Sequence, residues 1–338
     1  MTEVAKQTGE PSLLAKWKYV LATTNPPKGR LDLVSKWLVL TRASVLPMTI
    51  TAGMAAGLLA ANQDGFRLGY YLLALVGIVL AHVANNLMND LWDTQVGLDT
   101  ENYPRALYAP HPVLSGLTTR GGLLRGSLFV NAIDAVIGVI LFIAWGWPIV
   151  AIALAGFLLS AAYTAPPLRL KKRGLGEPTV LVVWGPLMLG GCYYAAVGSL
   201  PWHIVFASLP YGLLCTTVLM GKHVDKIPWD EPEGIHTLPV ILGETRARSV
   251  TKGMMVAFYV TTLALVVTGV FPWPALIAFG ALPVLAKVWP EFGKPRPAEP
   301  PKNFPIWPLW FAPLAFVHTR RAGALLVLGL IVGAVLGY

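Results

Sequence analysis

The chain has 338 residues, of which 55% are hydrophobic and 13% are charged, and its formal net charge is +9. An average soluble domain has about a quarter of its residues charged, so this composition excludes an ordinary soluble enzyme and an intrinsically disordered chain. The two cysteines, Cys192 and Cys215, lie in apolar stretches, where a packing role is favoured over a disulfide or a metal pair. The composition therefore predicts a multi-pass membrane protein.

The first 37 residues are polar and basic. They lack the continuous apolar core of a cleavable signal peptide. We expect residues 1–37 to form a cytoplasmic tail, with a surface helix near Leu13 to Leu21. The basic residues of this tail are Lys6, Lys16, Lys18, Lys28, Arg30 and Lys36.

Apolar runs over residues 38–338 predict about nine membrane-spanning helices. We expect an all-α bundle in which spans one to four and five to eight form two halves around a central cavity. The Pro-rich segment 290–308 is expected to be a cytoplasmic connection. The predicted spans lie near 38–62, 68–90, 121–146, 148–163, 177–198, 202–221, 249–270, 273–289 and 313–337.

Basic residues fall on alternate loops of this map. The loops 164–176 and 222–248 each contain four lysines or arginines, whereas the loops on the other side contain only Arg67. The positive-inside rule then places the N-terminus in the cytoplasm of a cell-membrane protein. An odd number of spans places the C-terminus on the opposite side. Because topology accounts for the positive charge, we expect no nucleic-acid partner.

Polar residues gather on one face at the end of the second predicted span. His82, Asn86, Asn89 and Asp93 share this face in an otherwise apolar helix. Carboxylate and amide oxygens are ligands that Mg²⁺ prefers, and Mg²⁺ commonly bridges to substrate phosphates. The sequence therefore favours a metal site here, and a polar cap at the helix end is the alternative. Asp90 and Asp99 add carboxylates to this first acidic cluster.

A second acidic segment, residues 221–239, is predicted on the same side of the membrane. Its four acids offer a second metal site, and its lysines offer positive charge to phosphate oxygens. Two facing acidic clusters with basic neighbours predict a diphosphate-ester site, and an exposed charged loop is the alternative. The segment contains Lys222, His223, Asp225, Lys226, Asp230, Glu231 and Glu233.

Three motifs resemble the UbiA superfamily of intramembrane prenyltransferases, and together they cover about residues 38–250. Asn89-Asp90-Leu91-Trp92-Asp93 with Gly97 and Asp99 resembles the first aspartate-rich motif, in the form found in dihydroxynaphthoate polyprenyltransferases. Tyr163-Thr164-Ala165-Pro166-Pro167-Leu168-Arg169-Leu170-Lys171, followed by Gly174-Leu175-Gly176-Glu177, is similar to the same branch. Asp230 with Gly234, Thr237 and Leu238 resembles the end of the second aspartate motif.

One position departs from the family pattern. Lys226 stands four residues before Asp230, where the family usually has an aspartate, and Asp225 lies one step earlier. Pro228 is expected to break the helical spacing, which would let Asp225 reach the metal. The alternative is that Lys226 contacts phosphate directly and that one metal site is altered.

The resemblance implies Mg²⁺-dependent transfer of a polyprenyl group from a prenyl diphosphate to an aromatic quinone precursor such as 1,4-dihydroxy-2-naphthoate. The implied metal ligands are Asn89, Asp90, Asp93, Asp99, Asp225 and Asp230. The implied diphosphate ligands are Lys171, Lys172, Arg173, Lys222, Lys226 and Arg42. The ring of Tyr163 is expected to stabilise an allylic cation, and His82, Asn86 and His223 are the candidate acceptor contacts.

Several alternatives stay open at this stage. Homogentisate, a tetrapyrrole or a glycerol phosphate lipid are alternative acceptors. A transporter is the alternative from another class, and its ionisable residues would cluster near the midplane. A cation channel or a lipid-binding protein without catalytic activity is a third. His82 is also typical of a hydrogen-bonded histidine in the interior. Basic residues that only set the membrane orientation are the alternative for Lys171, Lys172 and Arg173.

Overall fold

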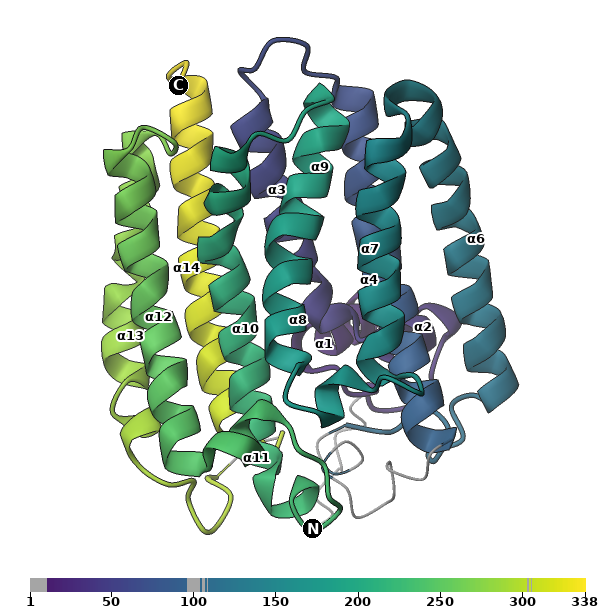
Figure 1. Ribbon diagram of the computed structural model, residues 1–338. Helices are drawn as coiled ribbons and strands as arrows, with labels where there is room; N and C mark the ends of the chain where they lie inside the picture. Colours follow the sequence, from purple (N-terminus) through teal and green to yellow (C-terminus); the bar gives the residue numbers. More distant parts are fainter. Residues whose placement is uncertain (1–10, 96–103, 105–106, 108, 303, 305) are drawn as a thin grey trace, which may run out of the picture.

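The computed structural model describes residues 11–95, 104, 107, 109–302, 304 and 306–338. In this part of the chain, helices lie side by side and are joined by loops at the two ends of a bundle (Figure 1). One isolated parallel bridge joins Arg173 and His236, and no strands occur among the described residues. The expected all-α membrane bundle is confirmed.

Eight helices among the described residues are long and apolar enough to cross a membrane. The eighth predicted span, 273–289, is the shorter helix Trp273–Val288. Its first nine residues form a 3₁₀ helix, η4 (Trp273–Ala281), and the rest form α13 (Leu282–Val288). Because a 3₁₀ helix rises about 2.0 Å per residue against about 1.5 Å for an α-helix, this element reaches roughly 28 Å, close to the thickness of the hydrocarbon core.

The spans form two halves with equivalent packing. Helix α4 packs against α6 in the first half, as α10 packs against α12 in the second, and α14 contacts α10, η4 and α3. The last helix therefore ties the two halves together. The first half contains α3 (Leu46–Ala60), α4 (Leu68–Gln95), α6 (Arg120–Trp145) and α7 (Trp147–Thr164). The rest contains α8 (Gly176–Val182), a π-helical turn η3 (Val183–Leu187), α9 (Met188–Val197), α10 (Trp202–Asp230), α12 (Glu244–Val267), η4, α13 and α14 (Phe311–Val335).

Two boundaries differ from the sequence prediction. Residues 38–42 do not belong to the first span, because α2 (Leu33–Leu40) ends there and Arg42 adopts a left-handed φ of 53° before η1 (Ala43–Val45) begins. Helix α10 does not break at Pro228 and continues to Asp230. Proline lacks a backbone N–H. Pro228 therefore costs the helix one backbone hydrogen bond, and the helix continues through it to Asp230.

Small residues allow the close helix crossings that position the polar end of the bundle. A side chain at Gly221 of α10 would lie 2.7 Å from the backbone of Phe311, the first residue of α14. Gly212 of α10 is also close to α8 and η3, where its added Cβ would lie 3.1 Å from the Leu181 carbonyl and 3.3 Å from Gly185 Cα. Close backbone approach through small residues is typical of packing in membranes.

The two ends of the bundle differ in what they carry. Helices α1 (Leu13–Thr23) and α2 lie at the end where α4, α7 and α10 finish, together with α11 (Leu238–Leu242) (Figure 1). The C-terminal residue Tyr338 lies at the opposite end (Figure 1). Asp32 caps α2 by accepting a hydrogen bond from the Ser35 amide at 2.9 Å, and it also accepts one from the Trp17 indole at 3.1 Å. The amino-terminal helices are thus fixed at the end that holds the acidic residues.

Candidate active site

The end of α4 faces the motif that begins at Tyr163. Lys171 donates to both carboxylate oxygens of Asp93 at 2.6 Å, and the Thr164 hydroxyl donates to Asn89 Oδ1. The Lys171 and Asp93 side chains are each 13% exposed. Asn89 and Asp93 share one helical face because they lie four residues apart. The structure therefore brings together the two motifs whose contact the sequence implies.

Asp90 points away from this face. It is fully buried and forms an ion pair with Arg42, while His111 Nε2 lies 3.9 Å from its carboxylate. The left-handed backbone at Arg42 turns the chain between α2 and η1. We expected Arg42 at the diphosphate and Asp90 at the metal, and the structure pairs them with each other. The remaining predicted ligand of this motif, Asp99, lies outside the described residues, as does Gly97.

Tyr163 connects the two acidic clusters. This tyrosine, at the end of α7, interacts electrostatically with Glu177, Asp93, Arg42 and Asp230. Asp93 belongs to the first cluster and Asp230 to the second, so both lie near one aromatic ring. A ring in this position is suited to a cation. One carboxylate of each cluster thus interacts electrostatically with Tyr163, and metal binding by the two together stays a prediction.

Lys172 lies within electrostatic range of three other cations, and together they offer a site for an anion. Burial, and then the positive charge of Lys171, lower the pKa of Lys172, and Arg169 and Lys226 act in the same sense while Asp93 opposes them. Lys226 Nζ lies 3.4 Å from Asp230 Oδ1, one turn further along α10. Cations that lower the pKa of Lys172 indicate a region of positive potential, which favours a bound anion. Half-buried Lys222 shares the α10 face of Lys226 and Asp230.

Asp225 lies on another face of α10 and serves the backbone of α14. Its two oxygens accept hydrogen bonds from the amides of Phe311 and Ala312, each at 2.9 Å. Five residues along a continuous helix turn a side chain by about 140°, so Asp225 and Asp230 cannot face the same point. The expected break at Pro228, which would have brought them together, is absent.

The Pro-rich segment fixes this end of α10. Arg296 donates to the Asp225 carbonyl at 3.1 Å and to the Pro308 carbonyl at 3.0 Å. Its guanidinium lies 5.3 Å from the ring centres of both Trp229 and Trp307. This contact anchors the segment that carries Lys226 and Asp230, and the sequence analysis did not predict it.

The candidate acceptor contacts occupy separate places. His82 Nδ1 lies 2.7 Å from the Thr49 hydroxyl and its ring meets Trp184 edge-on, while Asn86 donates to the Thr41 carbonyl at 2.9 Å. Both side chains therefore have hydrogen-bond partners inside the protein, as expected for polar residues in the interior. Arg173, predicted at the diphosphate, is exposed and donates to the Pro167 carbonyl at 3.0 Å.

His223 forms a buried pair with Glu177. Its Nδ1 lies 2.6 Å from Glu177 Oε1, and both side chains are at most 4% exposed. In the sequence, Glu177 stands out only as the last residue of the Gly174–Glu177 motif, and no role was predicted for it. A single acid at the start of an apolar span is a signal that would have marked it, because such residues are costly in membranes.

The donor set at the end of α4 fits Mg²⁺. No group of three or more His, Cys, Asp or Glu side chains suited to a metal occurs among the described residues. Mg²⁺ does not need one, because it commonly takes one or two carboxylates and completes its shell with water and substrate phosphate. Asn89, Asp93 and Asp230 offer oxygen atoms alone. The side-chain partners of Asn89 and Asp93 are groups that a metal can replace.

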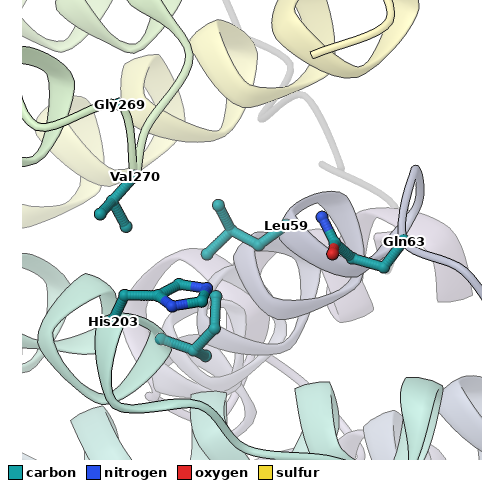
Figure 2. A pocket seen from close by; sticks show the side chains of 6 residues that line it. Leu59, Gln63, His203, Gly269 and Val270 are labelled. Atoms are coloured by element: carbon teal, nitrogen blue, oxygen red, sulfur yellow. The ribbon is translucent and has the colours of Figure 1, made fainter.

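A cavity of about 330 Å³ lies at the other end of the bundle. Figure 2 shows the side chains of Leu59, His203 and Val270 around this space, with Gln63 beside them. These residues come from the end of α3, the start of α10 and the turn after α12. The cavity is therefore separate from the cluster around Asp93.

Oxygen ligands and lysines gathered at one end of a multi-pass helical bundle define an intramembrane enzyme that handles an anionic substrate. Residues 48–317 match the UbiA prenyltransferase family. The chain belongs to this family and is a multi-pass membrane prenyltransferase.

Three known proteins illustrate the similarity. The chain is 29% identical to the 1,4-dihydroxy-2-naphthoate octaprenyltransferase of Haemophilus influenzae, over 74% of this chain and 83% of that protein. It is also 29% identical to the digeranylgeranylglyceryl phosphate synthase of Natronomonas pharaonis, over 81% of this chain and 90% of that protein. The fold matches a UbiA homolog from Archaeoglobus fulgidus bound to GPP and Mg²⁺, with a TM-score of 0.54, 14% identity and coverage of 86% and 99% of the two chains.

Proposed function

We propose that this enzyme transfers a polyprenyl group from a prenyl diphosphate to a hydroxylated aromatic acceptor, a quinone precursor such as 1,4-dihydroxy-2-naphthoate. The observation that carries this proposal is the contact of Lys171 with both carboxylate oxygens of Asp93 at 2.6 Å, which joins two of the motifs. The motifs resemble the naphthoate branch, and the Haemophilus relative is named for that acceptor.

Each residue of the site has a distinct part in the proposed reaction. Asn89, Asp93 and Asp230 would hold Mg²⁺, which neutralises the diphosphate leaving group when bound. Lys171, Lys172, Lys222 and Lys226 bind the diphosphate oxygens and stabilise the charge that develops on them as the C–O bond breaks. Lys171 leaves Asp93 when the substrate arrives.

A ring carbon of the acceptor then attacks the allylic cation beside Tyr163, whose ring faces the positive charge, and the proton of that carbon passes to the released diphosphate. Apolar helices exclude the water that would otherwise quench the cation. Asp225 has no part in this chemistry in our proposal, because its carboxylate holds the first turn of α14. Asp90 and Arg42 neutralise each other at the edge of the site.

The test is transfer with purified protein. Labelled prenyl diphosphates are incubated with 1,4-dihydroxy-2-naphthoate, homogentisate or a glycerol phosphate lipid, with Mg²⁺ or with a chelator. We expect metal-dependent product with the naphthoate. Absence of product with the naphthoate, with product from another acceptor, would contradict the proposed acceptor.

A glycerol phosphate acceptor is the second candidate. The Natronomonas relative supports it, since it matches a larger share of this chain than the Haemophilus enzyme does. The same acceptor panel separates the two candidates.

We also propose that the Asp93 end of the bundle is cytoplasmic. Lys171, Lys172 and Lys226 lie at this end, whereas Arg67 lies in the turn before α4 at the other. Single cysteines introduced at the exposed positions Glu233 and Asp64 test this in intact cells. We expect an impermeant thiol reagent to label the residue at 64 alone, because both native cysteines are buried.

A further inference from the structure

Glu177 is a buried carboxylate that the proposed chemistry leaves without a role. It lies in the first turn of α8 and is fully buried. Oε1 pairs with His223, but Oε2 is also buried and has no hydrogen-bond partner. Buried polar atoms are nearly always hydrogen-bonded, and each exception needs an explanation. The pair with His223 explains one oxygen and leaves the other without a donor.

Glu177 lies beside the reacting centre. A side chain at the preceding residue, Gly176, would stand 3.1 Å from Lys171 Cα and 3.4 Å from the Tyr163 ring. Glu177 also interacts electrostatically with Tyr163, as do Asp93 and Asp230. The carboxylate is therefore a neighbour of the ring where the cation is expected to form.

The Glu177 pair lies deeper in the bundle than Asp230. Its partner His223 precedes Asp230 by seven residues of continuous α10, which is about 10 Å along the helix axis. Glu177 itself begins an apolar span that continues to Val197. The pair therefore lies nearer to the apolar part of the bundle than Asp230 does.

Resting on the proposed function, we propose that Glu177 recognises the aromatic acceptor: Oε2 accepts a hydrogen bond from a ring hydroxyl of the acceptor, and His223 holds the carboxylate in place through Oε1. An ionised carboxylate is an acceptor only, so its ligand must bring a donor. A hydroxyl bonded to a carboxylate also shifts electron density into the ring, which favours attack by a ring carbon. Glu177 is thus a residue that determines acceptor specificity. The alternative is a purely structural role, in which its contact with His223 only holds α8 against α10.

The test measures equilibrium binding without prenyl diphosphate. Wild-type protein and Glu177→Gln are titrated anaerobically with 1,4-dihydroxy-2-naphthoate and with its 1,4-dimethoxy analogue. A hydrogen bond to a charged group predicts that the wild type prefers the hydroxyl form by about 10- to 100-fold. We expect Glu177→Gln to reduce this preference to about threefold or less by weakening the hydroxyl form alone. Glu299→Gln, at an exposed position, is the matched control and should keep the preference.

Three outcomes would overturn the proposal. One is equal affinity of wild-type protein for the two compounds, which decides the matter even if Glu177→Gln does not fold. Another is a variant that keeps the full preference. A third is equal weakening of both compounds with a lower thermal midpoint, which is the behaviour of a structural tie. Failure of the proposed function is distinct, because it appears as absence of metal-dependent product with every acceptor.

Discussion

The ends of α4 and α10 carry similar acidic sequences but use them differently. At the end of α4, Asn89 and Asp93 have side-chain partners, Thr164 and Lys171. At the end of α10, Asp225 has backbone partners, the amides of Phe311 and Ala312. A side-chain partner can rotate away when a metal or a phosphate arrives, whereas a helix N-terminus cannot. The kind of partner, and not the residue type, therefore separates a ligand from a structural cap.

The largest expected effect concerns the α4 cluster. Asp93→Asn removes the negative charge that metal and Lys171 share, and we expect the metal-dependent turnover to fall by about 10²–10³-fold or more. Initial rates at varied Mg²⁺ measure this, with size-exclusion elution and thermal midpoint as checks of folding. Asp134→Asn on α6 is the matched control, because it alters an aspartate elsewhere in the bundle. Full activity of Asp93→Asn would remove Asp93 from the site.

The opposite pattern is expected at α10. Asp225→Ala leaves two backbone amides of α14 without acceptors, and Asp225 is only 2% exposed. We expect a loss of about 2 kcal/mol or more in unfolding free energy, seen as a lower thermal midpoint in detergent. Asp225→Asn keeps one acceptor oxygen and should lose about half as much. An unchanged midpoint together with altered Mg²⁺ dependence would return Asp225 to the metal site.

The next prediction concerns Lys171, the partner of Asp93 at the end of α4. Lys171→Met keeps the length of the side chain but removes the charge, and we expect KM for the prenyl diphosphate to rise about tenfold. Arg173→Met serves as the control, because Arg173 is exposed and bonds the Pro167 carbonyl. We expect it to change KM less than about twofold. Equal effects of the two substitutions would show that general positive charge, and not the contact with Asp93, binds the substrate.

The smallest effect is expected at the half-buried helix cap Asp32. The hydrogen bonds from the Ser35 side chain and amide lower the pKa of Asp32 to about 2 from its usual 3.8. A pKa that is lower in the folded protein stabilises it above pH ~4, and this contribution is lost as the pH falls towards 2. Asp32→Ala should lower the thermal midpoint by no more than about 3 °C at pH 6 and by nothing near pH 2. Asp64→Ala, in the exposed turn before α4, controls for the loss of an acid.

Hydrophobic runs located the helices well because each span satisfies its own backbone and needs only length and apolarity. The face shared by Asn89 and Asp93 was also predictable, since helical periodicity depends only on sequence spacing. The predictions were wrong where contacts with other helices determine the local structure. The path of α10 through Pro228 depends on its packing against α12 and α14, and the left-handed turn at Arg42 precedes an ion pair with a residue 48 positions away.

The sequence alone determined the membrane class, the order of the spans and the family, because these depend on composition, periodicity and local motifs. Only the tertiary structure decided which acids meet. Asp93 and Asp230 come together near Tyr163 through the bundling of α4, α7 and α10, while the crossing of α10 and α14 at Gly221 directs Asp225 to a backbone terminus. The partner of a side chain depends on how helices from distant parts of the chain cross. The spacing of residues within one helix does not predict these crossings.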